Sequence, residues 1–126
     1  MKHIDIYMTA HNRWVIVKHY NFSEIDGICT RFGDSQYIGI RSGMNETDDR
    51  ETIAHELAHL EDGTENVMHV IAGKRAEKWK RELLIPYDNL REAMEEYGEH
   101  GIGFLATFFG VKYETMERRI KEAFNI

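Results

Sequence analysis

The sequence predicts an α+β fold, in which a small antiparallel sheet is followed by a helical half. Short runs of β-branched and aromatic residues, separated by polar and glycine-containing turns, fill much of the chain between Trp14 and Ile40. From Asp48 onward, the apolar residues recur at helical spacing instead of alternating. The length of 126 residues, without an internal repeat or a Pro/Gly-rich linker, predicts a single domain over residues 1–126.

The first half is predicted to contain one short helix and three strands. Residues 4–10 place Ile4, Tyr7 and Met8 on one helical face, and residues 14–17 are a β-branched and aromatic run that favours a strand. Residues 28–32 and 36–40 are two further runs of this kind. Gly33 lies between them and can supply the positive φ of a tight turn, so the two runs predict a hairpin.

The first long helix is predicted at residues 49–62. Asp48 precedes it and Glu51 follows three residues later, a pattern typical of a helix N-terminus with reciprocal capping bonds. Gly63 follows the last residue and suits the left-handed conformation that ends many helices.

A second long helix is predicted at residues 65–85. Pro86 ends it, because the residue before a proline avoids helical geometry. The remaining apolar pattern predicts three shorter helices, at residues 88–97, 102–109 and 113–124.

The charge balance narrows the possible functions. The 16 basic and 22 acidic side chains give a formal net charge of -6. An acidic chain attracts phosphates poorly, so nucleic acid is not an expected partner. No apolar run approaches the roughly 20 residues of a membrane-spanning helix. Cys29 is the only cysteine and the sequence after Met1 does not resemble a secretion signal, so we expect a cytoplasmic protein.

His55 and His59 stand four residues apart in the predicted helix, so their imidazoles project from one face, one turn apart. This spacing allows both to bind one metal ion, such as Zn²⁺. Glu56 lies about 100° around the helix from His55, which suits a base acting on water and not a ligand. The three residues predict zinc-dependent hydrolysis of a peptide bond.

The alternative is a solvent-exposed helix face on which the two histidines bind nothing. A five-residue pattern of this kind also arises by chance, so the pattern alone does not decide between the two. The apolar residues of the same helix favour the metal site, because burying them directs the histidines toward a cleft. They are Ile53, Ala54, Leu57, Ala58 and Leu60.

Three segments carry a more specific signal: RETIAHELAHL at residues 50–60, AEKW at residues 76–79 and LLIP at residues 83–86. Together they resemble the ImmA/IrrE family of zinc metallopeptidases, over about residues 25–120. The resemblance implies a zincin-like fold with Zn²⁺ as cofactor. Members of this family occur in phages, integrative elements and bacterial genomes, where they cleave or inactivate a helix-turn-helix repressor. It therefore implies such a repressor as the protein substrate.

By this resemblance, His55 and His59 would be metal ligands and Glu56 the catalytic base. The family's third ligand is a glutamate on the second helix, and the matching position here is Gly73. Glu77 lies one turn beyond Gly73 on the same face, and helical side chains lean toward the N-terminus of their helix. Its carboxylate can therefore reach back, and we predict Glu77 as the third ligand.

Other assignments of the third ligand stay open. His69 lies one turn before Gly73 and would have to lean against the usual direction, and Glu65 lies further away. Glu77 would otherwise be a solvated residue paired with Arg81, four residues on. A site that lacks a third ligand would make the chain a catalytically silent relative, which binds the repressor without cutting it.

DNA binding is a second hypothesis. Residues 102–120 show the pattern of a helix-turn-helix, which is an apolar helix, a glycine turn and a second helix that carries Arg118 and Arg119. Acidic residues of the same helix, and the acidity of the whole chain, oppose it because they repel phosphates. These residues are Glu114, Glu117 and Glu122.

Overall fold

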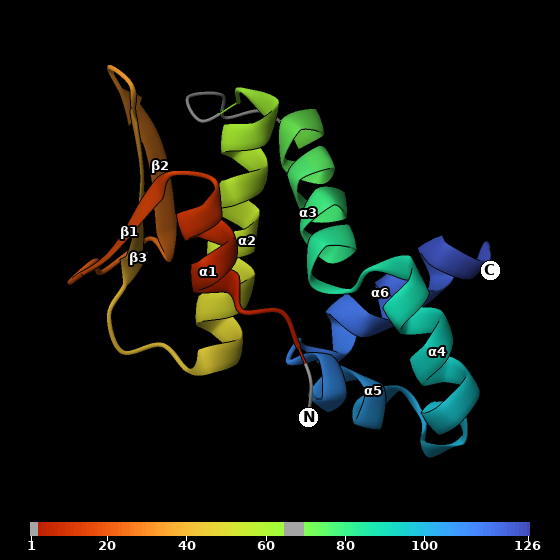
Figure 1. The fold of residues 1–126 in the computed structure, drawn as a ribbon. Coiled ribbons are helices and arrows are strands. Elements are labelled where there is room, and N and C mark those ends of the chain that lie inside the picture. The colour runs from red at the N-terminus through yellow and green to blue at the C-terminus, as the bar shows by residue number, and fades with distance from the viewer. Residues whose placement is uncertain (1–2, 65–69) are drawn as a thin grey trace. The chain divides into compact units, whose positions relative to one another are not determined.

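A computed structural model of the chain describes residues 3–64 and 70–126 (Figure 1). The described residues form two compact units. One unit is Asp5–Lys80, and the other is residues 81–126 together with His3 and Ile4. The predicted α+β fold is confirmed, because a three-stranded sheet lies in the N-terminal half and helices form most of the rest. The single domain over residues 1–126 stays a prediction.

The first unit begins with helix α1 (Ile6–Asn12) and strand β1 (Val15–Tyr20). The Asp5 carboxylate accepts a hydrogen bond from the Met8 backbone N–H at 3.1 Å, which fixes the helix start slightly later than predicted. Trp14 has a φ of 60° and separates the helix from the strand, so the strand starts after this residue.

Strands β2 (Gly27–Phe32) and β3 (Ser35–Arg41) form the predicted antiparallel hairpin, and Gly33 in its turn has a φ of 62°. The prediction that the whole sheet is antiparallel was wrong, because β1 pairs with β3 in parallel and the strand order is β1-β3-β2. Residues 21–26 connect β1 to β2 and leave the position between these two strands free. Strand β3, which follows the hairpin turn, then occupies that position. The sheet is therefore mixed, and β2 is an edge strand.

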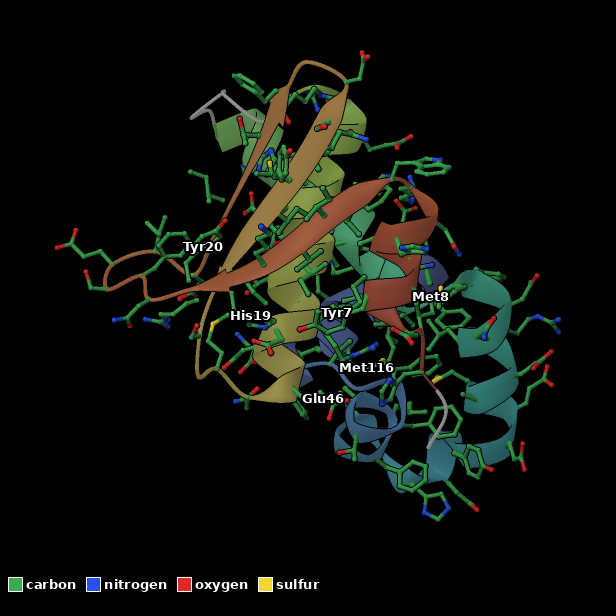
Figure 2. The ribbon with its side chains drawn as sticks, turned by 60° about the vertical axis from the view of Figure 1, so that its left-hand side comes forward. Tyr7, Met8, His19, Tyr20, Glu46 and Met116 are labelled. Atoms are coloured by element: carbon green, nitrogen blue, oxygen red, sulfur yellow. The ribbon has the colours of Figure 1, made fainter. Side chains whose placement is uncertain are left out.

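One face of the sheet packs against helix α2 (Glu46–Asp62). Alternate residues along each strand point to this face, as the two-residue period of a strand requires. The buried side chains of this core are Val15, Cys29, Ile38 and Ile40 from the sheet and Ile53, Ala54, Leu57 and Leu60 from α2. Figure 2 shows α1 and β1 meeting beside the start of α2, where the Tyr7 hydroxyl lies 3.3 Å from Nε2 of His19.

Helix α2 starts earlier than predicted, because Asn45 caps it and not Asp48. The Asn45 side chain accepts a hydrogen bond from the backbone N–H of Asp48 at 2.8 Å. Glu51, the predicted reciprocal partner, pairs instead with Lys80. Gly63 ends the helix with a φ of 69°, as predicted.

Helix α3 (Val70–Leu84) ends just before Pro86, as predicted, and its predicted start at residue 65 lies outside the described residues. In the second unit, Arg81 pairs with Glu122 at 2.5 Å and not with Glu77. The three shorter helices are confirmed as α4 (Tyr87–Tyr97), α5 (Ile102–Phe109) and α6 (Tyr113–Phe124), with a 3-10 turn η1 (Gly98–His100) after α4. Across residues 3–64 and 70–126, no helix is both long and apolar enough to cross a membrane.

Candidate metal centre

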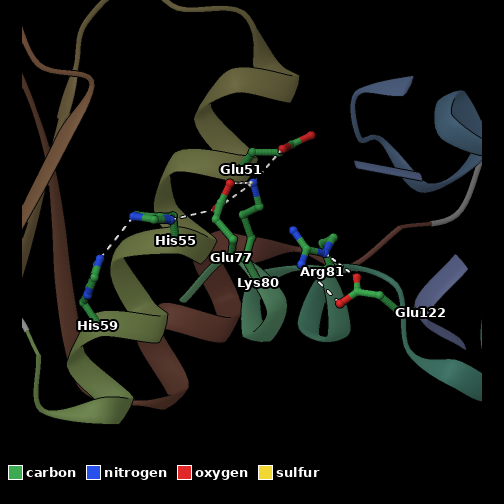
Figure 3. Close-up of polar contacts among 7 residues, drawn as sticks. All are labelled: Glu51, His55, His59, Glu77, Lys80, Arg81 and Glu122. Carbon is green, nitrogen blue, oxygen red and sulfur yellow. Dashed lines mark hydrogen bonds and ion pairs between the residues drawn. The ribbon is translucent and has the colours of Figure 1, made fainter. Parts of the chain in front are cut away.

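Helix α2 and the part of α3 in the same unit run antiparallel and are joined by polar contacts, some of which Figure 3 shows. Residues later in α2 pair with residues earlier in α3, so the two helices run in opposite directions. The joining pairs are Glu51 with Lys80, His55 with Glu77, and Asp62 with Arg75. The two helices therefore hold one row of polar side chains between them.

The structure brings His55 and His59 together, as their spacing predicted. Their Nε2 atoms lie 3.1 Å apart, and the two rings meet edge to face at an angle of 77°. Two nitrogens bound to one tetrahedral Zn²⁺, each at about 2.0–2.1 Å, would lie about 3.3 Å apart. The observed separation is close to that value.

The other ring nitrogen of each histidine has an oxygen partner. Nδ1 of His55 lies 2.8 Å from Oε2 of Glu77, and Nδ1 of His59 lies 2.9 Å from Oγ1 of Thr64. The turn at Gly63 places Thr64, whose backbone N–H also donates to the His59 carbonyl at 2.9 Å. Both imidazoles are therefore oriented through Nδ1, and both direct Nε2 to the same point.

These two nitrogens fit two of the ligand positions of a zinc ion. An ionised carboxylate only accepts hydrogen bonds, so His55 donates through Nδ1–H, and the lone pair of the neutral ring then lies on Nε2. That nitrogen faces the Nε2 atom of His59 at 3.1 Å, a contact that requires a proton or a cation between the two nitrogens. Neutral imidazoles held in this way are the nitrogen ligands that Zn²⁺ binds.

Glu77, the predicted third ligand, lies on the other side of His55. Its carboxylate contacts Nδ1, whereas His59 contacts Nε2. Within residues 3–64 and 70–126, no three His, Cys, Asp or Glu side chains are grouped so that they could hold one metal ion. None of the described residues lies within 4 Å of a Cβ added at Gly73, the position that the resemblance assigns to the family's third ligand. The alternatives His69 and Glu65 lie outside the described residues.

Glu56, the predicted base, is half-buried on α2 beside the edge strand β2. A Cβ added to Gly27 of β2 would lie 3.3 Å from Cγ of Glu56 and 2.5 Å from Cγ2 of Thr52. The absence of a side chain at Gly27 therefore permits this close approach of the strand to the helix.

The electrostatics of the site favour a charged Glu77 and a neutral His59. Burial acts to raise the pKa of Glu77, but the hydrogen bond with His55 and the positive charge of Lys80 oppose it, and the pKa falls to about 2. Burial lowers the pKa of His59, and the neighbouring His55 lowers it further. A neutral His59 is the form that binds metal.

Sequence reasoning missed three residues of this site, namely Thr64, Lys80 and Glu51. A signal existed for two of them, because Glu51 lies one turn before His55 and Lys80 lies one turn after Glu77.

The structure also changes how Arg119 is interpreted. Its side chain is buried and donates to the Ile85 carbonyl at 2.9 Å, so it supports the fold instead of facing solvent.

A small sheet packed on a helix that presents two histidines and an adjacent glutamate agrees with the metallopeptidase class that the sequence resembles. The comparison with family models agrees, since the model described as the IrrE N-terminal-like domain, of peptidase family M78, matches residues 8–121. The chain belongs to this metallopeptidase family. No curated protein and no solved structure matches it significantly.

Proposed function

We propose that the protein is a zinc-dependent endopeptidase that acts in the cytoplasm on a helix-turn-helix repressor of a phage or mobile element. The observation that carries the zinc assignment is the convergence of two Nε2 atoms at 3.1 Å while both Nδ1 atoms are held by oxygens. Membership of a metallopeptidase family supports the hydrolytic activity. The assignment of a repressor as the substrate rests on the resemblance of the sequence to the ImmA/IrrE proteins.

The residues divide the chemistry between them. His55 and His59 would hold the ion, which when bound polarises the scissile carbonyl and lowers the pKa of water. Glu56 takes a proton from the attacking water as its oxygen forms a bond to the carbonyl carbon. The carbon–nitrogen bond then breaks, and Glu56 passes that proton to the leaving amine. One water is consumed, and an acid and an amine are formed.

Metal content is the first test. The protein is purified without a chelator and without a histidine tag, and its zinc is measured by elemental analysis beside a His59→Ala variant. We expect about one zinc per chain, lost in the variant, because one imidazole cannot hold the ion alone. Absence of bound metal after zinc has been supplied would contradict the zinc assignment.

Cleavage of the cognate repressor tests the substrate. Glu56→Gln keeps a side chain of nearly the same shape but cannot take a proton, so we expect it to retain zinc and to lose cleavage by at least about 100-fold. The fragments of the repressor are identified by mass spectrometry. Cleavage that persists in Glu56→Gln would show that the assigned base is wrong.

Gly73 favours a second candidate function. The family position of the third ligand has no side chain, and a chain that lacks that ligand would hold the repressor without cutting it. Binding of intact repressor to wild-type protein, without cleavage at saturating zinc, would establish this silent relative in place of the peptidase.

A further inference from the structure

A chain of polar contacts leads away from the histidine pair into the space between α2 and α3 (Figure 3). Glu77 contacts Nδ1 of His55 at 2.8 Å. Nζ of Lys80 lies 3.0 Å from Oε2 and 3.2 Å from Oε1 of Glu77, and 3.0 Å from Oε1 of Glu51. One ammonium group therefore bridges two carboxylates, one of which contacts a candidate metal ligand.

The end of this row of contacts that lies away from the histidines is buried. The side chains of Lys80 and Glu51 are only 8% and 6% exposed, whereas that of Glu77 is 43% exposed. A buried ammonium group is tolerated only when it is paired and hydrogen-bonded. Glu51 provides that pairing inside the unit, which keeps Lys80 from turning out to solvent. Lys80 in turn fixes a Glu77 side chain that would otherwise move freely at a partly exposed site.

At the histidine end of this row of contacts, Glu77 determines which nitrogen of His55 carries the proton. Glu77 accepts from Nδ1–H, so it favours the neutral tautomer of His55 whose lone pair lies on Nε2. Nε2 is the nitrogen that faces His59. A carboxylate on the outer nitrogen of a ligating histidine also fixes the ring plane and makes the ligand more basic.

We propose that Glu77 is a positioning residue for His55 and not a metal ligand, and that the buried Lys80–Glu51 pair holds Glu77 in that role. The proposal rests on the proposed function in so far as His55 is a metal ligand. It differs from the expectation drawn from the sequence, in which the Glu77 carboxylate replaces the side chain that Gly73 lacks. In this structure that carboxylate is engaged with Nδ1, on the opposite side of the ring from His59.

The first experiment determines the tautomer of each histidine ring in the metal-free protein. Long-range ¹H–¹⁵N correlation spectra report which nitrogen of each imidazole carries the proton. We expect the Nδ1–H tautomer at His55 in the wild type and a mixture of tautomers in Glu77→Ala. The proposal also requires a shift of the same signals in Lys80→Met, although Lys80 is not in contact with His55 in this row of contacts. A purely structural role of Lys80 would leave the His55 tautomer unchanged.

The matched control is Arg75→Met, which removes the more exposed ion pair with Asp62 between the same two helices. It should leave the His55 ring signals unchanged. Where Lys80→Met fails to fold, the double variant Glu51→Gln with Lys80→Met removes both buried charges and must give the same His55 shift. Unchanged His55 signals in Glu77→Ala, or equal shifts in Arg75→Met, would overturn the proposal.

The second experiment distinguishes positioning from ligation. Zinc affinity, measured by competition with a chromophoric chelator, should fall about 10- to 100-fold in Glu77→Ala, as for other outer partners of ligating histidines. The visible spectrum of the Co²⁺-loaded protein should keep its shape and intensity per bound ion. A spectrum that shows a changed coordination number in Glu77→Ala would make Glu77 a ligand and overturn the proposal.

The two experiments separate this inference from the proposed function. A wild-type protein that binds neither Zn²⁺ nor Co²⁺ would contradict the zinc peptidase, while the tautomer of His55 in the metal-free protein would still decide the role of Glu77. Normal metal binding with an unperturbed tautomer in the variants would contradict the positioning role alone.

Discussion

Replacement of Lys80 by methionine should destabilise the first unit far more than the loss of an ordinary surface lysine. The ammonium group lies 3.0 Å from Oε1 of Glu51, and the two side chains are 8% and 6% exposed. At an effective dielectric constant of about 20, this contact corresponds to an attraction of about 5 kcal/mol. Methionine retains most of the buried volume but leaves the Glu51 carboxylate without the charge of Lys80.

We expect Lys80→Met to lower the free energy of unfolding by about 3–5 kcal/mol, the usual effect of removing one partner of a buried ion pair. Small domains are stable by about 5–15 kcal/mol, so a folded population should remain measurable. Glu77 adds little to this loss, because its side chain is 43% exposed and water can solvate its carboxylate.

The double variant Glu51→Leu with Lys80→Met distinguishes the loss of the charge pair from the loss of packing. It removes both charges and keeps apolar groups of similar size, so it should recover most of the stability lost in Lys80→Met. Arg75→Met removes the more exposed pair with Asp62 and should cost less than about 1 kcal/mol.

Urea denaturation followed by far-ultraviolet circular dichroism measures all three variants under identical conditions. The reasoning would be refuted by a cost below about 1 kcal/mol for Lys80→Met. A double variant no more stable than the single variant would refute it as well, since packing and not charge would then explain the loss.

Three further predictions concern the helix that carries the histidines and its neighbour. Gly73→Glu should raise zinc affinity about tenfold, because no described residue lies within 4 Å of an added Cβ and the new carboxylate would stand at the family's ligand position. Gly73→Ala, the control, should raise helix stability by about 1 kcal/mol and leave zinc affinity unchanged. Thr64→Val should weaken zinc binding about tenfold by removing the oxygen partner of His59, whereas Thr64→Ser should not, and equal affinities in a chelator competition would contradict this role. Asn45→Ala should cost about 1 kcal/mol in thermal denaturation through loss of the α2 cap, and an unchanged melting temperature would show that the cap contributes nothing.

Local patterns in the sequence were sufficient for much of the site-bearing helix. The four-residue spacing of His55 and His59 places both imidazoles on one face in any regular helix, and Gly63 marks its end through a conformation that favours glycine. The hairpin around Gly33 was predicted for the same reason, since its turn joins residues close in the sequence.

Features that depend on distant partners could not be predicted in this way. The parallel pairing of β1 with β3 depends on which edge of the hairpin is free, and no short pattern specifies that choice. Lys80 and Glu51 look like solvated charges until α2 and α3 are placed side by side, and only then do they become a buried pair. The preference for Asn45 over Asp48 as the cap was ambiguous for another reason, because both residue types cap helices well.

Gly27 shows how a residue without a side chain can be sensitive to mutation at a candidate active site. Any other amino acid there brings a Cβ to within 2.5 Å of Cγ2 of Thr52 and 3.3 Å of Cγ of Glu56. Either the Thr52 side chain must then turn away or β2 and α2 must move apart, and in the second case the proposed base would move with the helix. In a saturation mutagenesis screen scored by proteolysis, substitutions at position 27 should therefore lower activity, although this position contributes no functional group to the reaction.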